Sequence, residues 1–444
     1  MSEMSYLEKL LDGVEVEWLS LSKVFNLRNG YTPSKTKKEF WENGDIPWFR
    51  MDDIRENGRI LGNSLQRISS CAVKGGELFP ENSILISTSA TIGEHALITV
   101  PHLANQRFTC LALKESYVDC FDIKFLFYYC FSLAEWCRKN TTMSSFASVD
   151  MDGFKKFLIP LPCPDNPEKS LAIQSEIVRI LDKFTALTAE LTAELTARKK
   201  QYNYYRDQLL SFDEEQEKHI YLEKLLDGVE VEWKTLGEVA KYVRGLIYSK
   251  SSESADGQGY KVLRANNITL SNNCLNLNDV KVVRFDTKVK SSQKLYKNDI
   301  LISAASGSRE HVGKVAYIES DIDYYFGGFM GVVRCDEKLN PRYLFHVLTS
   351  DIFQKYLDEM LNSSTINNLN SAVMGRFKIP LPCPDTPEKS LAIQSEIVRI
   401  LDKFDTLTNS ITEGLPREIE LRQKQYEYYR DLLFSFPKPD SVTN

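Results

Sequence analysis

Apolar residues along two long stretches of the chain recur at alternating spacings of four and three, the pattern of a helix that packs along a seam. The first seam comprises Ile177, Leu181, Phe184, Leu191, Leu195, Tyr202, Tyr205 and Leu209, with Thr188 and Arg198 in the two remaining places. It predicts one helix over residues 167–212, roughly 70 Å long. A helix of that length needs a partner along it. The second stretch has the same seam at Ile397, Leu401, Phe404, Thr408 and Ile411, and we expect it to be that partner.

Local signals mark the ends of both helices. Asn166 and Thr386 stand directly before Pro167 and Pro387, which is the arrangement of an N-cap followed by proline at the first helical position. The prolines between 160 and 164 favour an extended chain before the first helix. In the second copy, the sequence Gly-Leu-Pro at 414–416 predicts that the helix kinks or restarts there.

Three blocks of sequence occur twice with almost no change. Residues 6–18 and 221–233 are identical, and residues 159–184 match 379–404 at 25 of 26 positions. The heptapeptide QYNYYRD at 201–207 returns as QYEYYRD at 425–431. The segments between the blocks, 19–158 and 234–378, show no similarity by eye. Drift after a duplication would not have preserved the blocks so completely, so we interpret them as a common frame around two segments with different recognition roles.

Both variable segments contain short β-rich runs separated by turns and followed by a helical stretch. We expect strands at 46–50, 83–87, 96–100 and 108–113 in the first segment, and at 260–264, 280–285, 299–303, 313–318 and 331–334 in the second. The helical stretches are 123–139 and 341–361. The predicted fold class is therefore α+β, with two α/β domains joined to long helices.

Charge is divided between the frame and the variable segments. The whole chain has a net charge of −6, but 19–158 has 17 basic against 15 acidic residues and 234–378 has 20 against 15. The frame has the remaining 18 basic and 31 acidic residues. Acidic helices suit contacts with proteins, so the variable segments are the better candidates for contact with nucleic-acid phosphates.

Composition and motifs exclude several other classes of protein. No apolar stretch is long enough for a membrane span, and nine cysteines without a CxxC pair indicate reduced thiols inside the cell. The sequence GSREHVGK at 307–314 has the wrong spacing for a phosphate loop, and Val315 stands where serine or threonine is required. The five histidines lack the spacing of metal ligands. We expect a chain without catalytic activity and without a cofactor or metal of its own.

Polar side chains suited to the edges of DNA bases cluster after the predicted strands. Arginine pairs with guanine, asparagine and glutamine with adenine, and serine and threonine with several bases, while lysine contacts phosphate. The candidates in the first variable segment are Lys35, Arg50, Asp52, Ser87, Thr88, Ser89, Asn105, Gln106 and Arg107. Those in the second are Arg264, Asn266, Asn267, Ser306, Ser308, Arg309, Asn370 and Ser371. Each one alone is more simply explained as a solvated loop residue, and the prediction depends on the clusters.

The repeated frame resembles the specificity subunit of Type I restriction–modification enzymes, in the branch with TAEL spacer repeats. The resemblance covers essentially the whole chain. The motifs that carry it are YLEKLLDGVEVEW, LAIQSEIVRILDKF, TAELTAEL at 188–195 and QYNYYRDQLLSF. The sequences GYTPSK at 30–35 and IPW at 46–48 support it less specifically.

The resemblance implies two target recognition domains, each reading one half of a bipartite, asymmetric site in double-stranded DNA. It also implies that the two long helices pack antiparallel as a coiled coil, which gives a pseudo-two-fold internal repeat. The implied segments are the N-terminal repeat (1–18), recognition domain 1 (19–160), the central helical spacer (161–220), the second repeat copy (221–233), recognition domain 2 (234–380) and the distal helical region (381–444). Two TAEL copies imply the shorter gap between half-sites, about one turn between their centres.

The partners implied by the resemblance are two methylation subunits and two restriction subunits in the bacterial cytoplasm. The former would supply S-adenosylmethionine and flip the target adenine, and the latter would use ATP and Mg²⁺. Two alternatives remain open at this point. A stand-alone DNA-binding regulator would need a dimerisation or effector domain, and a methyltransferase with its own recognition domains would need a cofactor loop and a catalytic motif, neither of which we find.

Overall fold

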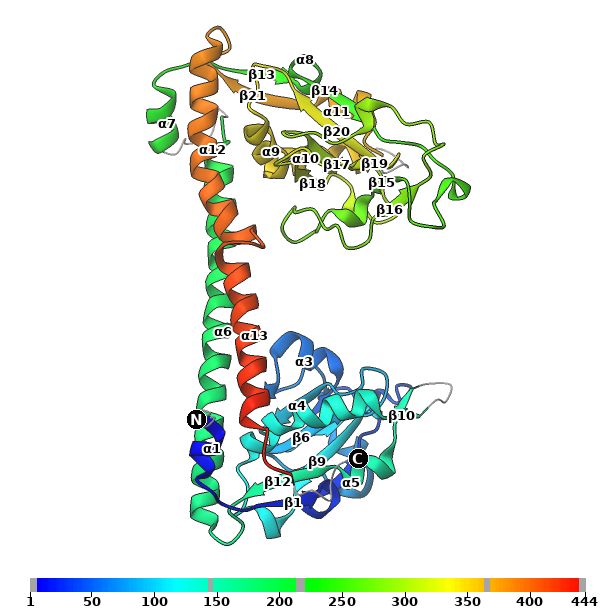
Figure 1. Ribbon diagram of the computed structural model, residues 1–444, viewed down its shortest axis with the longest axis vertical. Coiled ribbons are helices and arrows are strands. Elements are labelled where there is room, and N and C mark those ends of the chain that lie inside the picture. Colours follow the sequence, from blue (N-terminus) through cyan, green and yellow to red (C-terminus); the bar gives the residue numbers. More distant parts are fainter. Residues whose placement is uncertain (1–5, 143–146, 213–219, 363–367, 439–444) are drawn as a thin grey trace. The chain divides into compact units, whose positions relative to one another are not determined.

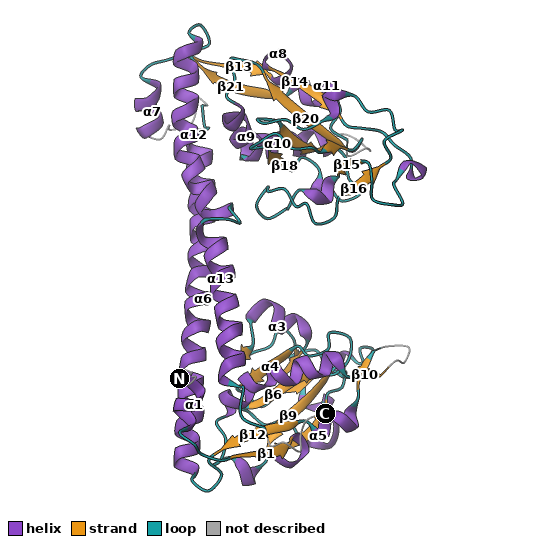
Figure 2. Cartoon of the chain, viewed as in Figure 1, coloured by secondary structure: helices purple, strands orange, loops and turns teal. Residues whose placement is uncertain are grey.

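The computed structural model describes residues 6–142, 147–212, 220–362 and 368–438. It divides into two compact units (Figures 1 and 2). Unit 1 consists of residues 1–187 and 422–444, and unit 2 of residues 188–421. The two units are described separately below. No helix in the described ranges is long and apolar enough to cross a membrane.

The predicted seam lies on three helices, α6 (Pro167–Leu209), α12 (Pro387–Asn409) and α13 (Gly414–Leu433). Helix α6 is 43 residues long and begins as predicted, because the Asn166 side chain accepts a hydrogen bond from the Lys169 amide. The predicted restart is confirmed, since the second helix ends at Asn409 and a new one begins at Gly414. Ile411 lies in this connection and is 59% exposed, so its assignment to the seam was wrong.

Each unit completes its core with a helix segment from the other repeat. In unit 1 the start of α6 lies antiparallel to the end of α13, and the Phe184 ring stacks on Tyr429 at 5.4 Å (Figure 1). Leu433 and Phe434 belong to the same buried cluster as Ile177. In unit 2 the end of α6 lies antiparallel to α12, and Tyr202 and Tyr205 stack on Phe404 at 6.3 and 5.5 Å. The two ends of the apolar seam are thus buried by pairing between the two repeats, while Leu191 and Leu195 in its middle are half-buried.

Besides a short ribbon of β10 (Thr141–Thr142) and β11 (Ser148–Val149), the variable segment of unit 1 forms two sheets. The larger has the strand order β2-β9-β6-β7-β4 and is antiparallel except for the β4–β7 pair, and the smaller has the order β5-β3-β8. Helix α4 (Ile123–Lys139) packs against β6 and β7. The strands are β2 (Phe25–Asn29), β3 (Ile46–Phe49), β4 (Ile60–Leu61), β5 (Arg67–Ile68), β6 (Ser83–Ser87), β7 (His95–Ile98), β8 (Leu103–Ala104) and β9 (Phe108–Leu113).

The variable segment of unit 2 repeats this strand order, except that in the described residues its larger sheet has four strands where that of unit 1 has five. Its larger sheet has the order β14-β20-β17-β18 and its smaller one β16-β15-β19. The strands are β14 (Ala240–Arg244), β15 (Tyr260–Leu263), β16 (Lys281–Val283), β17 (Ile300–Ser303), β18 (Val315–Tyr317), β19 (Tyr325–Phe326) and β20 (Met330–Cys335). The two segments therefore share one fold, although we saw no similarity between their sequences. Short stretches do agree, including Ile-Leu-Ile-Ser at 84–87 and 300–303.

The sequence pattern located most of these elements. Strands β6 and β9 and helix α4 have the predicted bounds residue for residue. The helix predicted at 341–361 is instead two helices, α9 (Pro341–Thr349) and α10 (Asp351–Asn362). They are interrupted at Ser350, whose hydroxyl donates to the Val347 carbonyl at 2.7 Å, because serine competes for backbone groups and favours helix ends.

The repeated blocks also form short sheets that close each domain. Strand β1 (Val16–Ser20) pairs antiparallel with β12 (Leu158–Pro162), and β13 (Val231–Thr235) pairs in the same way with β21 (Lys378–Pro382). Both proline-rich stretches are extended, as predicted. The pairing brings the start and the end of each recognition domain together beside the frame helix. Short helices complete the frame and the domains: α1 (Tyr6–Leu11), α2 (Leu21–Val24), α3 (Met51–Asn57), α5 (Met151–Lys156), α7 (Ile220–Leu226), α8 (Leu236–Val239) and α11 (Ser371–Arg376).

A buried glutamine on each frame helix anchors the adjacent domain. Gln174 accepts from the Asp122 amide at 2.9 Å and donates to the Cys120 carbonyl at 2.8 Å. Gln394 makes the same two bonds to the Asn340 amide and the Lys338 carbonyl, at 2.8 and 3.2 Å. Both glutamines are fully buried. Removing either would leave buried backbone groups without partners, so these bonds fix the domain to the helix.

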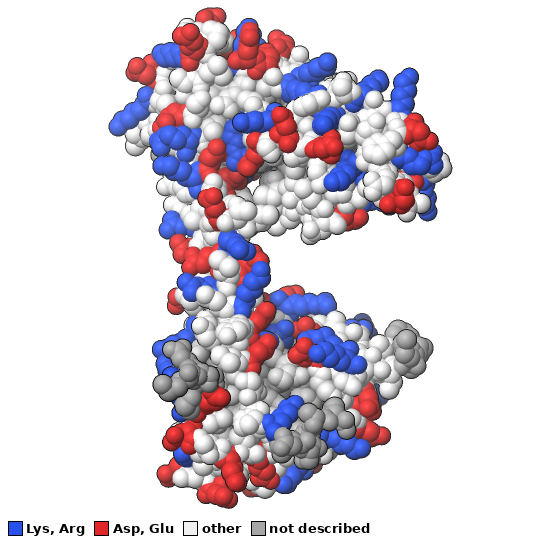
Figure 3. Space-filling model, viewed as in Figure 1, with Lys and Arg blue, Asp and Glu red and all other residues white. Residues whose placement is uncertain are grey.

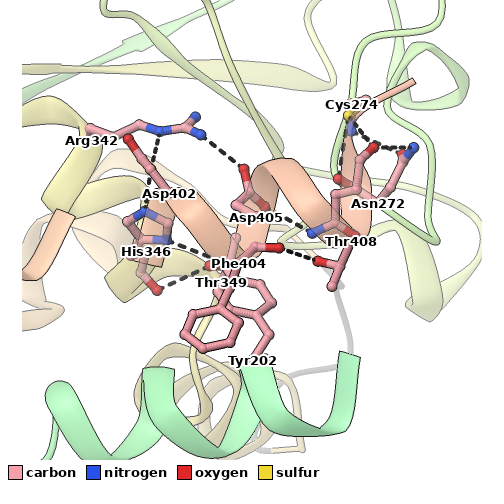
Figure 4. Close-up of polar contacts among 11 residues, drawn as sticks. Tyr202, Asn272, Cys274, Arg342, His346, Thr349, Asp402, Phe404, Asp405 and Thr408 are labelled. Atoms are coloured by element: carbon pink, nitrogen blue, oxygen red, sulfur yellow. Dashed lines mark hydrogen bonds and ion pairs between the residues drawn. The ribbon is translucent and has the colours of Figure 1, made fainter. Parts of the chain in front are cut away.

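An aspartate two turns further along makes a second anchor. In unit 1, Asp182 accepts from Lys124 and Tyr128, both at 2.7 Å. In unit 2, Asp402 accepts from Arg342 at 2.8 Å and from His346 at 2.7 Å, and Tyr202 of α6 contacts the other His346 ring nitrogen at 3.1 Å (Figure 4). Burial lowers the pKa of His346, although Asp402 opposes this shift. The neutral ring can then donate to Asp402 and accept from Tyr202, which joins α9, α12 and α6.

Two further buried histidines lie within unit 1. The His95 ring packs edge-on against Phe131 at 4.5 Å, and the His102 ring against Phe49 at 5.4 Å. Burial lowers the pKa of His95 to about 3 and that of His102 to about 4, from 6.5. Both rings are therefore neutral in the folded protein near pH 7.

We predict that unit 1 loses stability as the pH falls from 7 to 5. Both folded pKa values lie below the unfolded value, so in this range the unfolded chain binds more protons and the free energy of unfolding decreases. Each histidine should lower the free energy of unfolding by about 2 kcal/mol at pH 5. Urea unfolding followed by tryptophan fluorescence measures this, because Trp18, Trp41, Trp48 and Trp136 lie in unit 1.

His102→Gln is the matched control, because glutamine can still donate to the Val100 carbonyl, which His102 Nδ1 contacts at 2.8 Å, and does not titrate. It should remove about half of the difference between pH 7 and pH 5, since one of the two buried titrating rings is gone. Equal unfolding free energies of the unsubstituted chain at the two pH values would contradict the assignment.

Candidate nucleic-acid interface

Six of the nine residues predicted in the first variable segment meet around one surface basin. The basin has a volume of about 720 Å³, and its lining includes Lys35, Arg50, Asp52, Asn105, Gln106 and Arg107. Three further residues that we did not single out as base readers, Lys38, Trp41 and Arg55, also line it. Five basic side chains therefore face two acidic ones, Glu42 and Asp52. The basin can accept an anion and has donors and acceptors for base edges.

Buried groups hold the wall of the basin in place. Asp53 is fully buried and accepts from the backbone amides of Arg50 and Leu65, each at 2.6 Å. These bonds fix the turn between β3 and helix α3, from which Arg50 and Asp52 project. The Trp48 indole donates to the Tyr31 carbonyl at 3.0 Å and packs edge-on against Trp41 at 5.1 Å. The polar side chains are thus mounted on a rigid support.

The segment 105–107 forms the opposite wall. The Asn105 side chain accepts from the Arg107 amide at 3.0 Å, and Gln106 accepts from the Thr32 hydroxyl. Arg50 lies 3.6 Å from Asp52, while its Nε is buried without a hydrogen-bond partner among the described residues. Arg107 is exposed, and its guanidinium makes no hydrogen bond or ion pair with another described residue. Of the two arginines, Arg107 is therefore the more available to an incoming ligand.

The three other predicted residues of the first segment lie at the end of β6. Ser87 is fully buried, and its hydroxyl donates to the Ser89 carbonyl at 2.9 Å. The Thr88 hydroxyl lies 3.1 Å from that of Thr109 on the neighbouring strand. Ser89 is half-buried and pairs with Ser148 in a β-bridge. These contacts explain the residues by the fold, and their predicted contact with DNA stays a prediction.

The second variable segment has the same strand-to-helix turn. Arg264 follows β15 as Arg50 follows β3, and its backbone amide donates to Asn267 at 2.8 Å, as that of Arg50 donates to Asp53. The Arg264 guanidinium binds Asp279 at 2.8 Å, and Asn266 binds the same carboxylate at 3.1 Å. Asn267 is buried and donates to two backbone carbonyls, so its side chain supports the turn. Arg264 and Asn266 are the members that reach the surface.

The structure gives the remaining predicted residues of unit 2 other surroundings. Ser306 and Ser308 lie in the β17–β18 connection, where the Ser306 hydroxyl accepts from the Ser308 amide at 3.2 Å. Arg309 pairs with Asp358 at 3.1 Å and lines a different basin, of about 470 Å³. Asn370 caps helix α11 by accepting from two backbone amides, and Ser371 is the first, exposed residue of that helix. None of these five residues lies on the turn that presents Arg264.

Sequence reasoning missed the correspondence between the two interfaces. Equivalent backbone hydrogen bonds establish it. In unit 1 the Gly30 amide donates to the Phe108 carbonyl and the Asn105 amide to the Phe49 carbonyl. In unit 2 the Gly245 amide donates to the Met330 carbonyl and the Gly327 amide to the Leu263 carbonyl. A side chain at Gly30 would collide with the Asn105 carbonyl, and one at Gly245 with the Gly327 carbonyl. The spacing Gly-x₃-Ser-Lys at 30–35 and again at 245–250 was the available signal. By this correspondence Lys250 is the counterpart of Lys35.

The surface electrostatics favour local recognition over a uniform coat of positive charge. In Figure 3, Lys and Arg side chains are interspersed with Asp and Glu on the visible face of both units. In the described part of the chain, no group of three or more His, Cys, Asp and Glu side chains is arranged to hold a metal ion. The arrangement is suited to selective polar contacts at a few turns.

Comparisons with known proteins bear on the family of the whole chain. The model of the Type I restriction modification DNA specificity domain matches the chain twice, over residues 13–198 and 228–421. The chain is 60% identical to the Type I restriction enzyme EcoprrI specificity subunit of Escherichia coli, over 93% of each protein. It is 38% identical to the EcoR124I/EcoR124II specificity subunit of Escherichia coli, over the full length of both.

A solved structure shows the same fold. It concerns complex assembly and conformational transition of the type I R-M system, and it matches 94% of this chain and 97% of its own with a TM-score of 0.60 at 14% identity. Two family matches cover most of the chain, and the identity to the relatives extends over nearly its whole length. The chain therefore belongs to the family of specificity subunits of Type I restriction–modification enzymes.

Proposed function

We propose that each unit of this chain reads one half of a bipartite, asymmetric site in double-stranded DNA. The observation that carries the proposal is the matched pair of turns. The turn that presents Arg50 and Asp52 in unit 1 has the same place in the fold as the turn that presents Arg264 and Asn266 in unit 2. The frame around them is nearly identical in the two copies. The first reader is arginine in both, while the second reader and the surroundings of the turn differ. One fold presenting two sets of polar side chains suits two different base sequences.

The chain itself supplies recognition and no catalysis. The frame outside the two variable segments has 31 acidic against 18 basic residues and offers the surface on which two methylation subunits dock. Those subunits hold S-adenosylmethionine and flip the target adenine. Two restriction subunits use ATP and Mg²⁺. The gap between the half-sites is set by the length of the frame helices.

The experiment that tests this function is a methylome. The chain is co-expressed with its cognate methylation subunit, and N6-methyladenine is mapped by single-molecule sequencing. We expect a split, asymmetric motif that is methylated on both strands. If the chain copurifies with the methylation subunit but no such motif is found, the proposal that both units read DNA is wrong. If the two proteins do not copurify, the result favours the hypothesis of a stand-alone DNA-binding regulator.

Deleting residues 192–195 of α6 should change the gap in that motif and leave both half-sites unchanged. The Thr192 and Thr196 hydroxyls donate to carbonyls one turn earlier, at 2.8 and 2.9 Å, so the helix is continuous here. Four residues correspond to about 6 Å of helix, which is about one to two base pairs of DNA.

Thr192→Ala provides a control for the deletion, because it removes a hydroxyl without shortening the helix. It should leave the gap as it is. If the deletion altered the bases of either half-site, the role of α6 as a spacer would be wrong.

Arg107→Ala should weaken specific DNA binding and relax base choice in the first half-site only. A bidentate contact between arginine and guanine contributes about 1–3 kcal/mol of discrimination, so we expect roughly a 5- to 150-fold loss. The measurement is the dissociation constant of the complex for oligonucleotides with single base changes in each half-site. Lys139→Ala is the control, because Lys139 is exposed on α4 and pairs only with Glu135. Equal relaxation in both half-sites would contradict the assignment of unit 1 to one half.

A further inference from the structure

Two large apolar side chains lie on neighbouring segments at the surface of unit 2. Ile247 is 88% exposed and Phe329 is 73% exposed, and they are the two most exposed large apolar residues of the described chain. A Cβ atom built on Gly328, next to Phe329, would lie 3.1 Å from the Ile247 side chain, so the two segments are in contact. Single exposed apolar residues are common, but two this exposed on segments in contact need an explanation.

The backbone that presents them is firmly held. The Phe329 carbonyl accepts from the Ala304 and Ala305 amides at 2.8 and 3.0 Å, and the Gly328 carbonyl accepts from the Arg244 guanidinium at 3.0 Å. The Leu246 amide, one residue before Ile247, donates to the Phe326 carbonyl at 2.7 Å. The two side chains therefore project from a rigid turn and do not owe their exposure to a loose loop.

The turn is the counterpart of the wall of the unit 1 basin. The Thr88 amide donates to the Arg107 carbonyl as the Ala304 amide donates to the Phe329 carbonyl, which makes Phe329 the counterpart of Arg107. Ile247 follows Gly245 as Thr32 follows Gly30, so Ile247 is the counterpart of Thr32. Where unit 1 presents a hydroxyl and a guanidinium, unit 2 presents two apolar groups.

The neighbouring residues indicate the ligand. The Gly327 amide donates to the carbonyl of Leu263, and the next residue along is Arg264, the proposed base reader of unit 2. Lys250, the counterpart of Lys35, follows Ile247 by three residues and is exposed. An apolar pair beside these cations suits a nucleic-acid surface that combines phosphates with an apolar group. In the major groove of DNA that group is the C5-methyl of thymine.

We infer that Ile247 and Phe329 make an apolar contact with a thymine methyl group in the second half-site. This inference rests on the proposed function. Methylation of adenine on both strands places an A·T pair in each half-site, so a thymine is present there. Unit 2 thus discriminates by apolar contact at the position where unit 1 uses polar groups.

The test uses the complex of the full chain with its methylation subunits and oligonucleotides that contain the mapped site. Each thymine in the site is replaced in turn by deoxyuridine, which lacks only the methyl group. Deoxyuridine at one position of the second half-site should raise the dissociation constant roughly fourfold, which is the effect expected when one buried methyl group is lost. Phe329→Ala and Ile247→Ala should bind the unmodified site more weakly and should lose that difference between thymine and deoxyuridine.

Two internal controls keep the outcome specific. Phe285→Ala removes another exposed aromatic group of unit 2, 64% exposed, and should leave the deoxyuridine profile unchanged. Replacements in the first half-site should affect all variants equally. The contact is refuted if Phe329→Ala and Ile247→Ala still bind the thymine site more tightly than the deoxyuridine site, as the unsubstituted chain does. It is also refuted if no deoxyuridine replacement in the second half-site weakens binding by the unsubstituted chain. A missing methylated motif would instead refute the proposed function.

Discussion

Burial of the seam along α6 is the constraint on which the rest of the structure depends. A helix of 43 residues cannot cover its own apolar face, and the helices that lie along its seam, α12 and α13, come from the second repeat. Each unit therefore borrows the tyrosine-containing block from the other repeat, with Tyr426 in one core and Tyr202 in the other. The same helices carry the buried glutamines that anchor the recognition domains, so one pairing supports both the scaffold and the readers.

The anchors show how an unchanging frame holds two different domains. Asp182 and Asp402 occupy the same place in the repeat, but the first binds a lysine and a tyrosine and the second an arginine and a histidine. Charge-assisted bonds to a carboxylate tolerate such exchanges because several donor types fit the same acceptor. The frame thus fixes where each domain attaches, while its readers vary independently.

Sequence periodicity predicted the frame well and the interface in part. Helix α6 ends within three residues of the expected position because its seam repeats regularly. Six of the nine polar residues predicted in the first segment line one basin, and their contact with DNA stays a prediction. The burial of Ser87 and Asn267 depends on neighbours distant in sequence. Ile247 and Phe329 were missed because an exposed apolar residue has no pattern that distinguishes it from a core residue. The common fold of the two variable segments was missed because the stretches that agree are only a few residues long.

The discontinuity of unit 1 has a consequence for the order in which the chain matures. Unit 2 is one continuous stretch, whereas the core of unit 1 contains Leu433 and Phe434, more than 240 residues beyond Ile177. During synthesis, the recognition domain made first keeps an open apolar face until Leu433 and Phe434 have left the ribosome. The domain begun second can therefore close before the domain begun first.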